Sequence, residues 1–477
     1  MLFSEIILDN EKFRIDDEFF MKEYISAYRK IKSIPNIVLK DEISVLTDFH
    51  ANGSYEAISE VFELLDEPNF AYMVRTTDLE INNFSDNVKY ITKKAYNFLS
   101  KSQVFGGELL INKIGTPGKS YLMPYLNRPT SLGMNLFLIR TNENSCINEK
   151  FLYIYFNTNF GLKIINRKIN GTVPLTIDKA AIRSLYVPKF ESDFIYEISS
   201  LVDKVFDLEL EAKSMYRQAE LLLLDTLKLK DFNPPSQTIN IKSFADSFGT
   251  SGRLDAEFYQ EKYESYLEKI QAFNNGFIQI QQEYSQVKSK SKFDLPAYQY
   301  IEIGDINVSD GSYSFNEVAI EDLPANAKIM VKKGDILIST VRPNRGAVAI
   351  VEHDRDDLIV SGAFTVLRKK AKSHFNNEFL KVLLRIAIYK DWLLQFNVGT
   401  SYPVIKDEDI LNLVIPNVEE TIQTQIADLI LQSNYLRIKS KGLLEKAKKA
   451  VELAIEKDQE SALDFIKGKQ TNDCNVH

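Results

Sequence analysis

The chain has 477 residues, of which 44% are hydrophobic and 26% are charged, and its formal net charge is −8. This length allows two or three domains, and the composition is ordinary for a soluble protein. The acidic balance argues against nucleic-acid binding through bulk charge, although local basic loops can still bind. No run of eighteen apolar residues occurs, and the N-terminus is too acidic for a signal peptide. We therefore expect a cytoplasmic protein without a membrane partner.

Cysteine and histidine are too sparse to predict a metal site. The two cysteines, Cys146 and Cys474, cannot form a disulfide framework, and neither belongs to a cluster with metal-ligand spacing. The four histidines are scattered along the chain. We expect a reduced, metal-free protein with no cofactor.

The first 190 residues predict a domain that mixes helices and strands. An amphipathic helix should follow the segment Arg14-Ile-Asp-Asp-Glu, and short strands are expected at residues 70–74, 108–111 and 135–139. A helix at residues 149–163 and a strand at residues 185–187 should complete the domain. Pro188 then marks the entry to a further helix.

Residues 191–230 predict one long helix, because no Pro or Gly interrupts them and apolar residues recur at heptad spacing. A second segment, residues 419–457, has the same spacing, with Ser433 and Ser440 filling two gaps in its apolar stripe. Such helices span on the order of 60 Å and cannot bury their stripes alone. We expect the two to pack into one rod; the alternative is two core helices of ordinary domains.

The two halves of the chain repeat each other. Matching residues recur in the same order and at nearly the same separation, which predicts a duplication, two similar domains and a pseudo-two-fold molecule. The clearest matches are Arg14 with Arg253, Gly107 with Gly334, Phe151 with Phe379, Gly171 with Gly399, and Ile182 with Ile410.

No catalytic motif stands out. The segment Asn233-Pro-Pro-Ser236 is similar to the Asn-Pro-Pro-aromatic loop of amino-methyltransferases, but Ser236 cannot stack on a flipped base. We interpret this segment as the linker between the halves, since Pro breaks the preceding helix. A Gly-rich turn for a methyl donor and a phosphate-binding loop with Lys-Ser/Thr are both lacking.

Several loops do carry polar side chains suited to phosphates or base edges. The alternative for each loop is an ordinary turn with solvated charges. The candidates for DNA binding are Thr47, His50, Asn52, Ser54, Lys113, Lys119, Arg167, Lys168, Ser339, Thr340, Arg342, Asn344, Arg345, Asn397, Thr400, Ser401 and Tyr402.

The layout resembles the specificity subunit of type I restriction–modification enzymes. The resemblance is carried by the strand and turn that begin at Gly334, the loop Gly399-Thr-Ser-Tyr-Pro403, and the Ile415-Pro416 strand that leads into a helix with Gln423 and Gln425. The first copy departs from this pattern, because Gly107-Glu-Leu-Leu-Ile-Asn-Lys lacks the Ser-Thr pair and its later loop is one residue shorter.

The resemblance implies an α+β fold in which two target recognition domains are joined by two long helices in an antiparallel coiled coil. Each domain would recognise one half of a bipartite sequence in double-stranded DNA, and the coiled coil would set the gap. Two modification (methyltransferase) subunits would dock on it, restriction (translocase and endonuclease) subunits would join, and the chain itself would be non-catalytic. A protein-binding scaffold without DNA recognition and a methyltransferase with an unrecognised site remain as alternatives.

The expected domains follow from these patterns. They are a first recognition domain at 1–190, a spacer helix at 191–232, a linker and second recognition domain at 233–416, a second long helix at 417–457, and a polar, disordered tail at 458–477.

Overall fold

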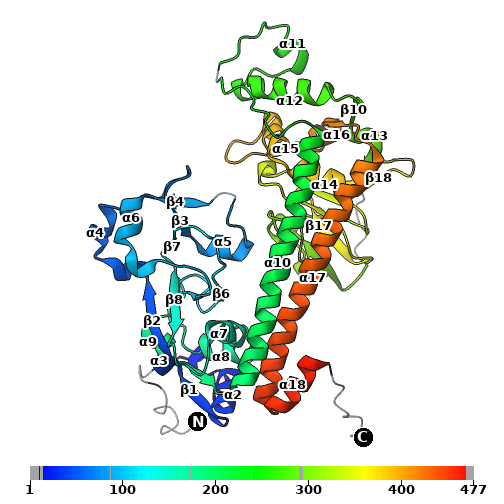
Figure 1. The fold of residues 1–477 in the computed structure, drawn as a ribbon. Coiled ribbons are helices and arrows are strands. Elements are labelled where there is room, and N and C mark those ends of the chain that lie inside the picture. Colours follow the sequence, from blue (N-terminus) through cyan, green and yellow to red (C-terminus); the bar gives the residue numbers. More distant parts are fainter. Residues whose placement is uncertain are drawn as a thin grey trace. The chain divides into compact units, whose positions relative to one another are not determined.

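The computed structural model describes residues 10, 14, 16–85, 88–171, 173–237, 239–288 and 294–468. The chain forms two compact units (Figure 1). The first unit contains Met1–Glu209 and Ile438–His477, and the second contains Leu210–Arg437. Both boundaries fall within the two long helices, so each unit contains a half of each helix as part of its own core.

The first unit contains two sheets and a separate strand pair. An antiparallel sheet has the order β2 (Ile43–Asp48), β8 (Leu136–Thr141), β5 (Leu109–Asn112), β6 (Ser120–Leu122). In the second sheet, β3 (Ala71–Val74) pairs antiparallel with β4 (Lys89–Ile91) and parallel with β7 (Thr130–Leu132). The pair is β1 (Asn36–Val38) with β9 (Tyr186–Pro188). The helices are α2 (Lys22–Lys32), α3 (Leu39–Glu42), α4 (Tyr55–Ser59), α5 (Thr76–Ile81), α6 (Lys93–Phe98), α7 (Glu149–Phe156), α8 (Asn159–Asn166) and α9 (Lys179–Arg183), with short 3-10 turns η1 (Glu18–Phe20), η2 (Phe49–Asn52) and η3 (Ser100–Ser102).

The second unit follows the same plan. One antiparallel sheet has the order β11 (Tyr284–Gln286), β18 (Phe364–Lys369), β15 (Ile336–Ser339), β16 (Val348–Ile350). The other has the order β13 (Asn316–Ala319), β12 (Ala297–Ile301), β17 (Leu358–Ser361), β14 (Ala327–Met330), and β10 (Phe277–Gln279) pairs with β19 (Val414–Pro416). The helices are α11 (Phe248–Ser251), α12 (Glu261–Gln271), α13 (Ile280–Glu283), α14 (Asn377–Arg385), α15 (Ala387–Trp392) and α16 (Asp407–Asn412), with 3-10 turns η4 (Ala256–Tyr259), η5 (Ile303–Asp305), η6 (Ile320–Asp322), η7 (Pro343–Arg345) and η8 (Leu393–Phe396).

The predicted duplication is confirmed by the strand order. Each unit has a four-stranded antiparallel sheet, a second sheet that contains one parallel strand pair, and one separate strand pair. Ion pairs with a buried carboxylate recur as well: Glu108 binds Arg140 on β8, and Asp335 binds Arg368 on β18. The second unit differs by having the additional strand β14, which pairs with β17.

The two long helices are α10 (Ser192–Thr226) and α17 (Glu420–Glu456), close to the predicted limits. In the second unit the buried hydroxyl of Ser433 donates to the Ala212 carbonyl at 2.7 Å, and Leu223 packs in one cluster with the earlier α17 residue Ile426. The helices are therefore antiparallel. In the first unit Ser440 donates to the Val205 carbonyl at 3.3 Å. These serines occupy the gaps in the apolar stripe because their small side chains let the backbones approach while their hydroxyls stay hydrogen-bonded.

Two predicted helices are interrupted. The first, predicted at residues 149–163, divides into α7 and α8, because the Thr158 hydroxyl accepts the Gly161 N–H at 3.1 Å and caps a new helix. Its counterpart in the second copy, residues 377–396, divides into α14, α15 and η8, with Ile386 extended between the first two (ψ 153°). Helical periodicity alone does not reveal such breaks.

The prediction of a disordered tail from residue 458 was wrong for most of its described part. A helix, α18 (Gln459–Lys467), follows Asp458, whose side chain accepts the Ser461 N–H. Ala462 and Ile466 on this helix are buried in the core of the first unit. The residues are polar overall but amphipathic in pattern, so a short helix gains stability by packing one face. Residues 469–477 lie outside the described chain.

Candidate nucleic-acid interface

In the second unit, the loop after β15 and the loop before α16 form one surface. Val341 pairs with Val404 in a β-bridge, and the Arg342 N–H donates to the Pro403 carbonyl at 2.7 Å. The Ile405 N–H donates to the Thr340 carbonyl at 2.9 Å. The structure thus brings together two predicted loops that lie more than fifty residues apart in the sequence.

Six of the predicted DNA-binding residues are exposed on these loops. They are Arg342, Asn344, Arg345, Thr400, Ser401 and Tyr402. The Arg342 guanidinium lies 5.4 Å from the centre of the Tyr402 ring, a cation–π contact that links the loops. Arg342 is also one of few non-glycine residues with a left-handed backbone (φ 49°), a conformation that such residues rarely adopt. Cationic, aromatic and hydroxyl groups on one surface can bind a phosphate, stack on a base, or hydrogen-bond to the edge of a base.

The other three candidates of this surface support the loops from within, and their role as DNA contacts stays a prediction. Ser339 is buried and donates to the Val341 carbonyl at 2.7 Å, and Thr340 donates to the Ala363 carbonyl at 2.8 Å. The Asn397 side-chain oxygen accepts the N–H groups of Gly399 and Val404, at 2.8 and 2.9 Å. These polar atoms are committed to the loop backbone, and Ser339 and Thr340 are also shielded from solvent.

Arg385 is the residue that sequence reasoning missed. It lies on α14 with only 6% of its surface exposed. Its guanidinium donates to the Tyr216 hydroxyl on α10 at 2.8 Å, to the Gly346 carbonyl at 2.8 Å, and to the Val308 carbonyl at 2.9 Å. Arg385 therefore ties the loop that carries Arg345 to the long helix. A charged residue in an amphipathic helix looks solvated in sequence, and nothing in the pattern marked it as buried.

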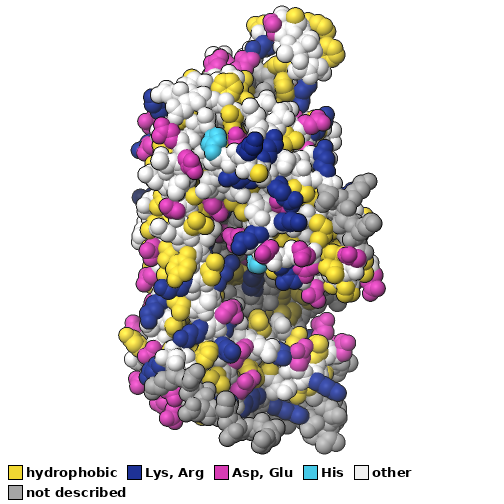
Figure 2. Space-filling view, turned by 90° about the vertical axis from the view of Figure 1, so that its right-hand side faces the viewer, with side chains coloured by type: hydrophobic (Ala, Val, Ile, Leu, Met, Phe, Trp, Pro, Cys, Tyr) yellow, Lys and Arg dark blue, Asp and Glu magenta, His cyan; other side chains and the backbone are white. Residues whose placement is uncertain are grey.

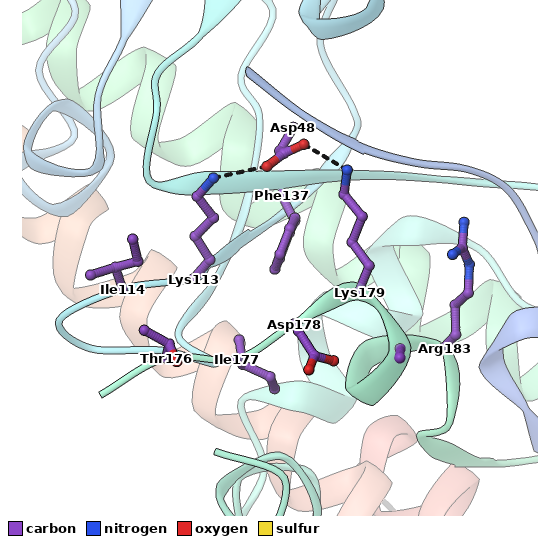
Figure 3. A pocket seen from close by; sticks show the side chains of 10 residues that line it. Asp48, Lys113, Ile114, Phe137, Thr176, Ile177, Asp178, Lys179 and Arg183 are labelled. Atoms are coloured by element: carbon purple, nitrogen blue, oxygen red, sulfur yellow. Dashed lines mark hydrogen bonds and ion pairs between the residues drawn. The ribbon is translucent and has the colours of Figure 1, made fainter. Parts of the chain in front are cut away.

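In the first unit, the equivalent loops enclose an open pocket of about 630 Å³. Ile114 pairs with Thr176 in a β-bridge, and the Ile177 N–H donates to the Lys113 carbonyl at 3.1 Å, which joins the loop after β5 to the loop before α9. The lining combines charged, polar and apolar side chains. Figure 3 shows its side chains, which are Asp48, Lys113, Ile114, Phe137, Thr176, Ile177, Asp178, Lys179 and Arg183, together with Ala180.

Asp48, at the end of β2, is held between two lysines. Lys113 Nζ lies 2.8 Å from one carboxylate oxygen, and Lys179 Nζ lies 2.6 Å from the other. In Figure 3, the Phe137 ring lies below these three charged groups. Burial would raise the pKa of Asp48, but the hydrogen bonds and charges of the two lysines outweigh burial and hold this pKa below its ordinary value. The carboxylate is therefore ionised at neutral pH and acts only as an acceptor.

The four candidates in the predicted loop at residues 47–54 have different surroundings. His50 is half exposed, and its Nδ1 lies 3.3 Å from Lys113 Nζ, so it reaches the pocket. Thr47 is buried within β2, and Asn52 bonds Ser102 and the Phe49 carbonyl. Ser54 caps α4 by accepting the Ala57 N–H at 3.2 Å. The polar groups of Thr47 and Asn52 thus serve the packing of the unit itself, and their role as DNA contacts stays a prediction.

The remaining first-unit candidates lie outside this pocket lining. Lys119 is exposed and pairs with Glu80 at 2.9 Å. Arg167 is buried, donates to the Phe19 carbonyl, and its guanidinium lies 4.2 Å from the Phe19 ring centre; its role as a DNA contact stays a prediction. Lys168 is half-buried beside it. Thr172, in the same predicted loop, lies outside the described residues.

Figure 2 shows the charges on one face of the molecule. Acidic and basic side chains both occur on it, several Lys and Arg side chains gather near its middle, and hydrophobic side chains are scattered between them. At a net charge of −8, a nucleic-acid interface would have to rely on local basic loops rather than on bulk charge. In the described ranges no group of three His, Cys, Asp or Glu side chains could hold a metal ion. Likewise, none of the described helices is long and apolar enough to cross a bilayer.

Comparisons with known proteins point to one family. Residues 269–449 match the family model of the Type I restriction modification DNA specificity domain. The HindI type I restriction enzyme specificity subunit of Haemophilus influenzae is 32% identical over 146 residues, which cover 29% of this chain and 31% of that protein. The match thus spans about a third of the relative's length.

Two solved structures are also similar. The S subunit of a type I restriction–modification system from M. genitalium has 11% identity and a TM-score of 0.40, and the alignment covers 90% of this chain and 95% of that one. The HsdS subunit from Thermoanaerobacter tengcongensis has 11% identity and a TM-score of 0.26, with coverage of 91% and 97%.

Proposed function

We propose that this chain, which belongs to the family of type I restriction–modification specificity subunits, is the sequence-specific DNA-binding subunit of such a complex. Each unit recognises one half of a bipartite target in double-stranded DNA. The paired helices α10 and α17 set the gap between the two half-sites and provide the frame on which two modification subunits dock. Restriction subunits join the assembly, which works in the cytoplasm.

The observation that carries this proposal is the exposed surface of the second unit. It lies within the matched residues 269–449 and carries Arg342 and Arg345 beside Tyr402 and two hydroxyls. Arg is the side chain best suited to a bidentate contact with guanine or to a phosphate, and neighbouring polar groups complete such contacts. The first unit has the same sheet topology, which supports a second recognition surface at the equivalent loops, where the side chains differ from those of the second unit.

The chain serves recognition, and the chemistry belongs to its partners. The Asp48 carboxylate of the first-unit pocket is paired with two lysines and is not a free base, which supports a role in recognition rather than in group transfer. The specificity subunit therefore acts by placing a modification subunit over an adenine in the recognised sequence.

The test is methylation mapping in a host that lacks other adenine methyltransferases. The chain is expressed with its modification subunit, and the modification subunit alone is the control. We expect methylated adenines only within one bipartite sequence, and only when both proteins are present. Methylation that is absent or independent of sequence, together with stable association of the two proteins, would favour a scaffold without DNA recognition.

A further inference from the structure

The first-unit pocket presents hydrogen-bonding groups in a fixed order. Lys113 Nζ and Lys179 Nζ each bind a different oxygen of the Asp48 carboxylate, at 2.8 and 2.6 Å. The row therefore alternates donor, acceptor, donor, as Figure 3 shows. The three side chains come from three separate elements: β2, the loop after β5, and the start of α9. We call this row the Lys–Asp–Lys triplet.

The exposure of the triplet suits a ligand at its outer edge. The side chains of Lys113 and Asp48 are 10% and 11% exposed, and that of Lys179 is 32% exposed. Each ammonium has three protons and uses one on Asp48, and Lys113 Nζ also lies 3.3 Å from His50 Nδ1. Each carboxylate oxygen can accept a further bond. The pairing of Asp48 with the two lysines thus fixes the order of donors and acceptors. Hydrogen-bonding capacity remains on these groups for the edge of a ligand that enters the open pocket.

The base pairs of DNA differ in the order of groups on their major-groove edges. An A·T pair presents adenine N7 as acceptor, adenine N6 as donor and thymine O4 as acceptor, followed by the thymine methyl group. A G·C pair presents two adjacent acceptors and then a donor. A donor–acceptor–donor row complements the whole A·T edge, whereas on G·C it would set the Asp48 carboxylate against a second acceptor.

The rest of the pocket fits the remaining group of that edge. Besides the triplet, its lining includes the apolar side chains of Phe137, Ile177 and Ala180. Apolar side chains are the usual contacts for the thymine methyl group. We propose that the Lys–Asp–Lys triplet selects an A·T pair at one position of the half-site that the first unit recognises. This assignment rests on the proposed function and names the first unit's specificity residues.

The second unit lacks the triplet at the equivalent positions. Thr340 follows β15 where Lys113 follows β5, and Asp407 begins α16 where Lys179 begins α9. The second residue of β18 is Thr365 where β8 has Phe137, and the Thr365 hydroxyl donates to Asp407 at 2.6 Å. The A·T preference that the Lys–Asp–Lys triplet sets should therefore appear in one half-site only.

The test compares methylation by complexes of the full chain with its modification subunit, on DNA libraries that vary every position of both half-sites. With the wild-type chain we expect one position in one half-site where G·C lowers methylation roughly 10- to 100-fold. Asp48→Ala should reduce that preference to within about threefold and leave the other positions unchanged. Lys179→Met, which keeps the buried Asp48–Lys113 pair, should weaken the same preference, and Lys179→Arg should retain it.

Lys150→Met is the matched control, because it removes a lysine from an aspartate pair (Lys150–Asp203) outside the pocket lining. It should keep every preference. The inference is overturned if the wild type shows no A·T-restricted position, if the Lys179→Met protein keeps the full preference, or if the variants relax all positions together. A wild-type chain that directs no sequence-specific methylation would instead remove the proposed function itself.

Discussion

Arg385 offers the sharpest test of how the second unit holds its surface loop. Its guanidinium makes three hydrogen bonds, to Tyr216, Gly346 and Val308, and it is almost fully buried. A hydrogen bond to a charged group contributes about 1.5–3 kcal/mol, and removing one partner leaves the others buried and unsatisfied. Arg385→Met should therefore cost the second unit about 3–5 kcal/mol.

The assay is denaturant unfolding of the full chain, combined with hydrogen exchange of the loop at residues 343–346. The N–H groups of Arg345 and Gly346 donate within this loop, and both should exchange at least about tenfold faster in Arg385→Met, because the loop loses its tie to α10. Arg183→Met, at an exposed position in the other unit, should change neither measurement in the second unit. A loss below about 1 kcal/mol with unchanged exchange would refute the reasoning.

Three further outcomes follow from the charges and helices. Neutralising Arg342 and Arg345 should lower the log–log salt slope of DNA binding by about 0.9 for each phosphate that is no longer bound, or relax one half-site, as measured by binding across salt concentrations. Because the pKa of Asp48 is lowered in the folded state, its ion pairs stabilise the protein above its ordinary pKa of 3.8 and cease to do so as pH falls through the lowered value. The stability difference between wild type and Asp48→Asn should accordingly shrink in acid unfolding curves. Deleting seven residues from each of α10 and α17 keeps the stripe in register and should shorten the gap in methylated sites by up to about three base pairs.

The sequence predicted the duplication and the long helices well, because both depend on periodic patterns. The heptad spacing led to α10 and α17, and the serines that interrupt it proved to bond the facing backbone at Ala212 and Val205. Helix ends were less predictable. The first helix ends at Thr226, before Lys228 takes a left-handed conformation, because the Leu229 N–H bonds the Leu224 carbonyl.

For the candidate site, the sequence identified polar loops but not which of their residues are exposed. Polar loop residues such as Arg342 and Tyr402 lie on the surface, whereas Arg167 and Ser339 are buried, and residue type alone does not separate the two groups. Lys179 was not among the candidates, because it belongs to the pocket only when the loop before α9 meets the end of β2. Such cross-element pairs depend on the tertiary fold.

The central claim is that each unit recognises its own half of the target. The most direct measurement replaces residues 253–416 with the corresponding segment of a relative that has a different target, and maps methylation with the same modification subunit. This segment contains the exposed surface of Arg342 and Tyr402, and it leaves the first-unit pocket intact. A methylated sequence that changes in one half-site only is the predicted result. Changes in both half-sites, or in neither, would contradict the account.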